Sequence, residues 1–237
     1  PERCFARARE VANGIDKNSS PKCKPNLLGL PIAVKDYNDL SGVRTTYGSN
    51  IFKNNIPKDS DRTIKLLERN GANPVAKSNV PEWAGGHTFN PVHGLTRNPW
   101  DISKSAGGSS GGSASALASG QVFLATGNDL GGSLRTPAGF NGVVGLRPSP
   151  GLIPRGDRYM PFDTLWVEGP MARTVEDLAL MLDSMVGHDI GDPLSFKSKT
   201  GCFIESLKRD LKPISIAVSE DLNLVPVDSE VRKVFKT

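Results

Sequence analysis

Cysteine and histidine are scarce in this chain of 237 residues, with three of each. Cys4, Cys23 and Cys202 lie far apart and form no CxxC pair, which argues against a metal or redox site built on thiolates. An odd cysteine count suits a reducing compartment, and we expect a cytoplasmic location. We therefore expect neither metal nor redox chemistry.

Long apolar runs are also missing, since no stretch approaches the ~20 residues that a membrane span needs. The net charge of +4 is spread along the chain, and no run of Lys and Arg is interleaved with aromatic residues. Neither a GxxxxGK[ST] phosphate loop nor a GxGxxG after a strand is present. We therefore expect no membrane partner and no nucleic-acid partner, and nucleotide binding has little support.

Apolar residues are patterned as in a globular protein with alternating strands and helices, which predicts an α/β architecture. Glycine (25) and proline (18) are plentiful, so many tight turns are expected. Helices are predicted over 2–13, 60–70, 110–119 and 175–186, the last capped by Thr174, and buried strands over 27–36, 73–77, 122–129 and 214–218. The chain opens without Met and ends in a helical pattern at 228–237, so we expect a single domain over 1–237 that continues beyond both ends.

The stretch "GGSSGGSAS" at 107–115 has the composition of a flexible linker. Its flanks do not suit a linker, because Pro99 and Trp100 precede it and an apolar strand follows it. A second glycine–serine cluster, "NDLGGSLR", lies a short way downstream at 128–135. We therefore interpret both clusters as parts of one packed site.

Two kinds of serine chemistry are compatible with these clusters. Residues 107–111 match the G-x-S-x-G nucleophile elbow around Ser109, although no strand precedes them, and His188 is the only histidine downstream. His87 and His93 lie in a glycine-rich loop and are interpreted as structural. The other base is Lys35, which ends the apolar run "GLPIAV" and would be neutral if buried. From the local sequence alone, Lys35 could equally be a surface charge.

Three stretches in order resemble the amidase signature family: "GLPIAVKD", "NPWD…AGGSSGGSAS" and "GNDLGGSLRTPAGFNGVVGLRPS". The resemblance runs from about residue 29 to about residue 175. Ser133 also follows Ser109 by 24 residues, the interval that the family keeps between its two catalytic serines. The fold implied is a mixed β-sheet core flanked by α-helices on both faces.

The resemblance also implies roles for individual residues. Ser133 would be the nucleophile, Ser109 a bridging serine after a cis peptide bond from Gly108, and Lys35 the base. Asp129 and Arg135 would pair to hold the nucleophile's loop, and Ser110 would line the substrate pocket. Consecutive N–H groups would form an oxyanion hole, for which glycines suit the required backbone dihedrals. Its donors would be the backbone N–H groups of Leu130, Gly131, Gly132 and Ser133.

The resemblance implies hydrolysis of a carboxamide through an acyl-enzyme on Ser133, with no metal and no cofactor. The expected partner is a small-molecule amide substrate, and a homodimer is left open. One alternative is a glutamine-hydrolysing amidase subunit of a tRNA-dependent amidotransferase. The other is a non-catalytic binding domain that retains the motifs.

Overall fold

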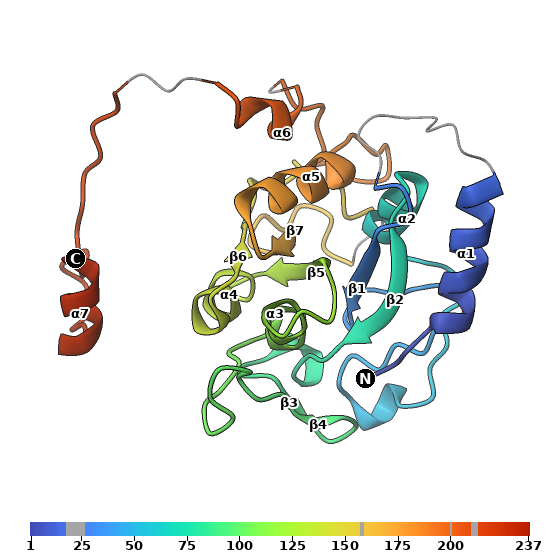
Figure 1. The fold of residues 1–237 in the computed structure, drawn as a ribbon, viewed down its shortest axis with the longest axis horizontal. Helices are drawn as coiled ribbons and strands as arrows, with labels where there is room; N and C mark the ends of the chain where they lie inside the picture. The colour runs from blue at the N-terminus through green and yellow to red at the C-terminus, as the bar shows by residue number, and fades with distance from the viewer. Residues whose placement is uncertain (18–26, 157–158, 200, 210–212) are drawn as a thin grey trace. The chain divides into compact units, whose positions relative to one another are not determined.

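The computed structural model describes residues 1–17, 27–156, 159–199, 201–209 and 213–237 (Figure 1). Its residues fall into two compact units, Pro1–Leu207 and Lys208–Thr237. The first unit contains the sheet and all the residues predicted to be catalytic. The second contains one short helix, α7 (Ser229–Phe235), whose first turn is capped by the Asp228 carboxylate at 2.8 Å from the Glu230 N–H.

A five-stranded mixed sheet forms the centre of the first unit, in the order β2-β1-β5-β7-β6. Strand β1 (Pro31–Lys35) lies parallel to both β2 (Asn73–Ser78) and β5 (Leu124–Asp129). Strand β7 (Val167–Ala172) is antiparallel to β5 and to the short β6 (Val144–Gly145). The carboxyl ends of β1 and β5 therefore meet at one edge of the sheet.

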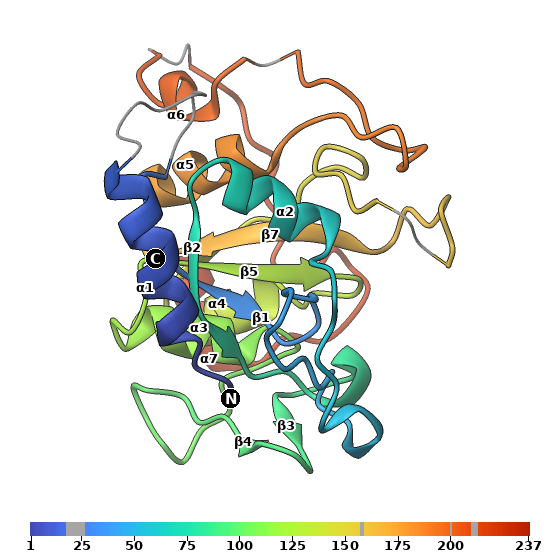
Figure 2. The same cartoon turned by 90° about the vertical axis from the view of Figure 1, so that its right-hand side faces the viewer.

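Helices cover both faces of this sheet, as the sequence predicted (Figure 2). Ile32 and Val34 of β1 pack in one core with α2 (Arg62–Arg69) and α5 (Val175–Met185). Ala33, which has the opposite orientation in the strand, belongs to a second core with α3 (Gly111–Ala118) and α4 (Arg135–Asn141). Helix α1 (Phe5–Lys17) lies along β2 (Figure 1).

Most predicted elements are present with small shifts of their ends. The predicted strands at 27–36 and 73–77 and the predicted helix at 60–70 are β1, β2 and α2, and the predicted helices at 110–119 and 175–186 are α3 and α5. Thr174 caps α5 as expected, since its hydroxyl accepts the N–H of Asp177 at 3.1 Å. Short 3₁₀ turns at Asn50–Phe52 and Glu82–Ala84, a hairpin of β3 (Phe89–Asn90) and β4 (Gly94–Leu95), and α6 (Phe203–Ser206) complete the described elements.

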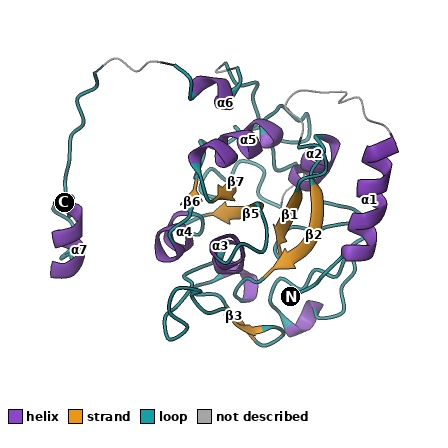
Figure 3. Cartoon of the chain, in the orientation of Figure 1, coloured by secondary structure: helices purple, strands orange, loops and turns teal. Residues whose placement is uncertain are grey.

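The predicted strand at 214–218 is wrong, and Figure 3 draws these residues as loop. Ile214 and Ile216 are 70% and 73% exposed. An apolar run becomes a strand only where a neighbour supplies ladder partners, and no strand within the described ranges pairs with this segment. The apolar pattern alone therefore gave the wrong structure here.

The glycine–serine stretch at 107–115 is packed inside the first unit and is not a linker. Ser109, Ser110 and Ser113 are all buried. A Cβ atom at Gly108 would overlap the carbonyl oxygen of Gly86, and one at Gly112 would overlap the backbone of Asn79. The absence of side chains at these glycines lets two other loops approach the start of α3.

No helix in the described part of the chain is long and apolar enough to cross a membrane.

Candidate active site

Lys35 is fully buried at the carboxyl end of β1, so it is not a surface charge. Its backbone N–H donates to Thr126 Oγ1 of the neighbouring β5 at 2.9 Å. Burial lowers the pKa of Lys35 to about 7, against the opposing influence of the Glu168 and Asp129 carboxylates. At neutral pH a large share of this side chain is therefore the neutral amine that a general base requires.

Three side-chain oxygens surround the Lys35 amine. Nζ lies 2.6 Å from Ser109 Oγ, 3.0 Å from Ser110 Oγ and 2.5 Å from Asn128 Oδ1. The Gly108–Ser109 peptide bond is cis, as the resemblance implied. The fold thus brings together Lys35 and Ser109, which are 74 positions apart in the sequence.

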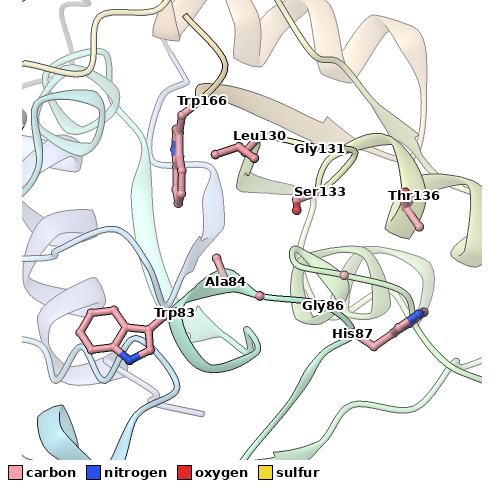
Figure 4. A pocket seen from close by; sticks show the side chains of 11 residues that line it. Trp83, Ala84, Gly86, His87, Leu130, Gly131, Ser133, Thr136 and Trp166 are labelled. Atoms are coloured by element: carbon pink, nitrogen blue, oxygen red, sulfur yellow. The ribbon is translucent and has the colours of Figure 1, made fainter. Parts of the chain in front are cut away.

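Ser133 lies in the turn between β5 and α4, where it lines a cavity of about 490 Å³ together with Gly108 and Gly131. Figure 4 shows its side chain pointing toward the segment that carries Ala84 and Gly86. The Ser133 carbonyl accepts the N–H of Ser110 at 3.2 Å, which joins the two glycine–serine clusters. Within the described residues, the Ser133 hydroxyl makes no hydrogen bond with Ser109.

Asp129 organises the turn that carries Ser133. Burial alone would raise its pKa, but Arg135 and the N–H groups of Gly132 and Leu134 hold the pKa at about 2. Arg135 binds both carboxylate oxygens, with Nε at 3.0 Å and Nη2 at 3.1 Å, in the predicted pair. Arg147, which the sequence did not single out, adds a further hydrogen bond to the same carboxylate at 3.0 Å.

The four predicted oxyanion donors do not share one environment. The N–H of Gly132 donates to Asp129 Oδ1 at 2.8 Å and holds the turn in place. For Leu130, Gly131 and Ser133 the described part of the chain supplies no acceptor to the N–H, and all three residues line the cavity. The turn therefore presents fewer available donors than the motif suggested.

In the described part of the chain, neither Ser109 nor Ser133 has a histidine as a hydrogen-bond partner. His188 is exposed in the loop after α5, and among the described residues no histidine hydrogen-bonds to Ser109. His93 Nε2 lies 3.2 Å from Thr46 Oγ1, in keeping with the structural role predicted for it. His87 borders the cavity, and its Nδ1 lies 2.8 Å from Ser105 Oγ. The geometry thus favours Lys35 over a histidine as the base.

Sequence reasoning did not identify several residues of the site. Asn128 lies in the quoted "NDLGGSLR" motif, but nothing in the motif showed that its amide would reach Lys35. Trp83 and Trp166 also border the cavity, although both lie far from Ser109 and Ser133 in the sequence (Figure 4). In the described ranges, no three His, Cys, Asp or Glu side chains gather as metal ligands.

Comparison with known proteins places the chain in a family. The family model described as Amidase matches residues 2–237. The A subunit of glutamyl-tRNA(Gln) amidotransferase from Carboxydothermus hydrogenoformans is 39% identical over 227 residues, which are 95% of this chain and 46% of that protein. The chain belongs to the amidase family, and it spans about half the length of the curated relatives that it matches.

Solved structures agree with this assignment. A bacterial aryl acylamidase of the amidase signature family matches with a TM-score of 0.80 and 31% identity, over 87% of this chain and 44% of that one. The A subunit of glutamyl-tRNA(Gln) amidotransferase from Thermotoga maritima matches with a TM-score of 0.67 and 30% identity, over 83% of this chain and 47% of that one. Both matches support the mixed α/β fold.

The prediction about partners is wrong. The family resemblance implied a small-molecule amide substrate, and the lack of a basic run with aromatic residues led us to expect no nucleic acid. The similar relatives are instead subunits of an amidotransferase named for glutamyl-tRNA. One subunit can serve a nucleic-acid reaction without a basic surface of its own if another subunit holds the RNA, so mild charge was a poor guide.

Proposed function

We propose that the protein is the glutamine-hydrolysing amidase subunit of a tRNA-dependent amidotransferase. In this proposal it breaks the carboxamide C–N bond of glutamine through an acyl-enzyme on Ser133. One observation carries this proposal: the buried Lys35 amine lies 2.6 Å from Ser109 Oγ, beside the cavity that Ser133 lines. The similarity to this class of amidotransferase subunits supports the choice of glutamine and of a tRNA-dependent complex.

The first step forms a tetrahedral intermediate on Ser133. Ser133 Oγ attacks the carbonyl carbon, its proton passes to Ser109 Oγ, and the proton of Ser109 passes to neutral Lys35 Nζ. The carbonyl π electrons move onto the oxygen, where the N–H groups of Gly131 and Ser133 stabilise the charge. This step requires the Ser133 hydroxyl to come within hydrogen-bond reach of Ser109 when substrate binds, as such contacts often tighten only then.

The second half of the reaction returns the groups to their starting state. The oxyanion re-forms the carbonyl, the C–N bond breaks, and the nitrogen takes a proton from Lys35 through Ser109 and leaves as ammonia. A water molecule then attacks the Ser133 ester and gives up a proton along the same path. Cleavage of that ester releases glutamate and restores the Ser133 hydroxyl.

The experiment measures ammonia released from glutamine and from simple amides by the full-length protein, alone and with its amidotransferase partner subunits. We expect release from glutamine that rises when the complex and tRNA are present. Ser133→Ala should abolish it, whereas the control Ser103→Ala, at an exposed loop position, should not. Hydrolysis of simple amides with no action on glutamine would contradict the proposal that glutamine is the substrate. Ammonia release that does not depend on Ser133, or no release at all, would favour a non-catalytic binding domain.

That residues 1–237 form one amidase signature domain stays a prediction, as does the cytoplasmic location.

A further inference from the structure

We propose that Asn128 is a positioning residue that, together with Ser110, directs the lone pair of neutral Lys35 toward Ser109. The inference rests on the proposed function, because it concerns the base of that reaction. Asn128 lies at the end of β5, is 1% exposed, and touches Lys35 through its side-chain amide. Its contribution would be the direction of a lone pair, since it does not line the cavity itself.

The argument begins with a count of hydrogens on Nζ. A neutral amine has two hydrogens and one lone pair, and three partners lie within 3.0 Å of it. Asn128 Oδ1 carries no hydrogen and can only accept, so one amine hydrogen must point at it. At 2.5 Å this is also the shortest of the three contacts.

Ser110 takes the second hydrogen. Apart from Lys35, the partner of its hydroxyl within the described residues is the backbone carbonyl of Asn128, at 3.4 Å. A carbonyl oxygen only accepts, so the hydroxyl hydrogen of Ser110 faces Asn128 and its oxygen lone pairs face Nζ. Asn128 thus determines both contacts, one through its amide and one through its main chain.

Ser109 is left facing the lone pair. Of the three partners, it alone has a hydroxyl hydrogen that neither Asn128 nor Ser110 engages, and its oxygen lies 2.6 Å from Nζ. The Ser109 hydroxyl therefore donates to Lys35, which is the direction in which the proton must move. Without the Asn128 acceptor, the amine could rotate and turn a hydrogen toward Ser109.

The neighbouring charges explain why a neutral amide suits position 128. Two carboxylates, Asp129 on β5 and Glu168 on β7, raise the pKa of Lys35, but each has other partners. These two carboxylates and the nearby Asp36 carboxylate all interact with other side chains. Asp129 binds Arg135 and Arg147, Glu168 accepts Trp166 Nε1 at 3.1 Å and lies 3.9 Å from Arg155, and Asp36 after β1 faces Lys77 of β2 at 3.6 Å and His93 at 3.7 Å.

The test replaces Asn128 by the nearly isosteric aspartate in the full-length protein. The rate at which a fluorophosphonate labels Ser133 is measured against pH, because labelling needs the base but no particular amide. A carboxylate against Nζ favours the ammonium, so in Asn128→Asp the acidic limb of the pH–rate profile should move to higher pH by about 1 to 3 units. The labelling rate on the high-pH plateau should stay the same. Asn54→Asp adds the same charge at an exposed loop position and should leave the limb in place. An unmoved limb in Asn128→Asp would overturn the proposal.

A second variant separates positioning from charge. Asn128→Leu keeps the branching at Cγ but removes the acceptor, so the labelling plateau should fall at least about tenfold while the melting temperature shows a folded protein. A plateau equal to that of the wild type would contradict a positioning role. If Asn128→Leu does not fold, Ser110→Ala, which removes the other acceptor, should lower the plateau in the same way.

A direct titration keeps this inference separate from the proposed function. The ¹³Cε resonance of Lys35 in the inactive Ser133→Ala background reports its pKa without any turnover. We expect Asn128→Asp to raise that pKa, and an unchanged value would exclude the proposal. A wild-type protein that labels at Ser133 but ignores glutamine would refute the substrate and leave the role of Asn128 intact.

Discussion

The N–H of Ser110 donates to the carbonyl of Ser133 at 3.2 Å and so ties the start of α3 to the turn before α4. This one backbone contact fixes the two glycine–serine clusters against each other. It places Ser133 beside the cis peptide of Gly108–Ser109 without using either hydroxyl. The Ser133 side chain consequently stays available for chemistry while its backbone is held.

Replacing Lys35 by Met should reduce labelling of Ser133 by about a thousandfold or more, because Met keeps the buried stem but has no lone pair. In the wild type the base is active when neutral, so the rate should rise with pH and reach half its plateau near the pKa of about 7. Stopped-flow or quenched labelling from pH 5 to 9 checks both points. A flat profile would mean that another group activates the serine.

Replacing Asp129 by Asn should lower the free energy of unfolding at pH 7 by about 2 kcal/mol, the value of a pKa held near 2. A depressed carboxylate pKa contributes stability above its unfolded value of about 3.9, and this is lost as pH falls through about 2. Urea denaturation at pH 7 and pH 3 should therefore show a smaller difference at pH 3. Asp59→Asn, at a largely exposed carboxylate, serves as the control.

Replacing Gly112 by Ala should destabilise the protein by about 2 kcal/mol or more, since its Cβ would overlap the Asn79 backbone. The matched control is Gly139→Ala in α4, where a Cβ meets nothing within 4 Å. That change should be stabilising by about 0.5 to 1 kcal/mol. Thermal melting of both variants tests the pair, and equal melting temperatures would show that the α3 contact yields easily.

Replacing His188 by Gln should leave the rate of Ser133 labelling within about threefold of wild type, because the side chain is exposed and a Ser-Ser-Lys relay needs no imidazole. A loss of several orders of magnitude would revive the serine–histidine hypothesis. The same labelling assay decides the question.

Local sequence was sufficient where the signal is itself local. The apolar run before Lys35 predicted a buried strand end, and the spacing in 175–186 predicted α5 with its Thr174 cap. The family motifs supplied Ser109 and Ser133, but the contact between Lys35 and Asn128 depends on β1 and β5, which are distant in sequence and adjacent in the sheet. No local pattern contains that adjacency.

The remaining features of the site depend on tertiary contacts. Arg147 reaches Asp129 from beyond α4, and Glu168 lies opposite Asn128 only because β7 runs antiparallel to β5. Trp166 enters the cavity wall for the same reason. The apolar segment at 214–218 shows the converse, since a strand-like pattern has no meaning without a partner strand.

The three glycines around α3 have a consequence for how this cavity could change over generations of mutation. Positions 108, 111 and 112 face Gly86, Thr88 and Asn79 so closely that almost any side chain would displace a neighbouring segment. Of these three glycines, Gly108 lines the cavity, so the wall at that position tolerates little change. Trp83 and Trp166 border the cavity with partly exposed rings, so changes in size or polarity there disturb fewer neighbours. An experimenter seeking new substrates should therefore randomise the tryptophan side and leave the glycine side untouched.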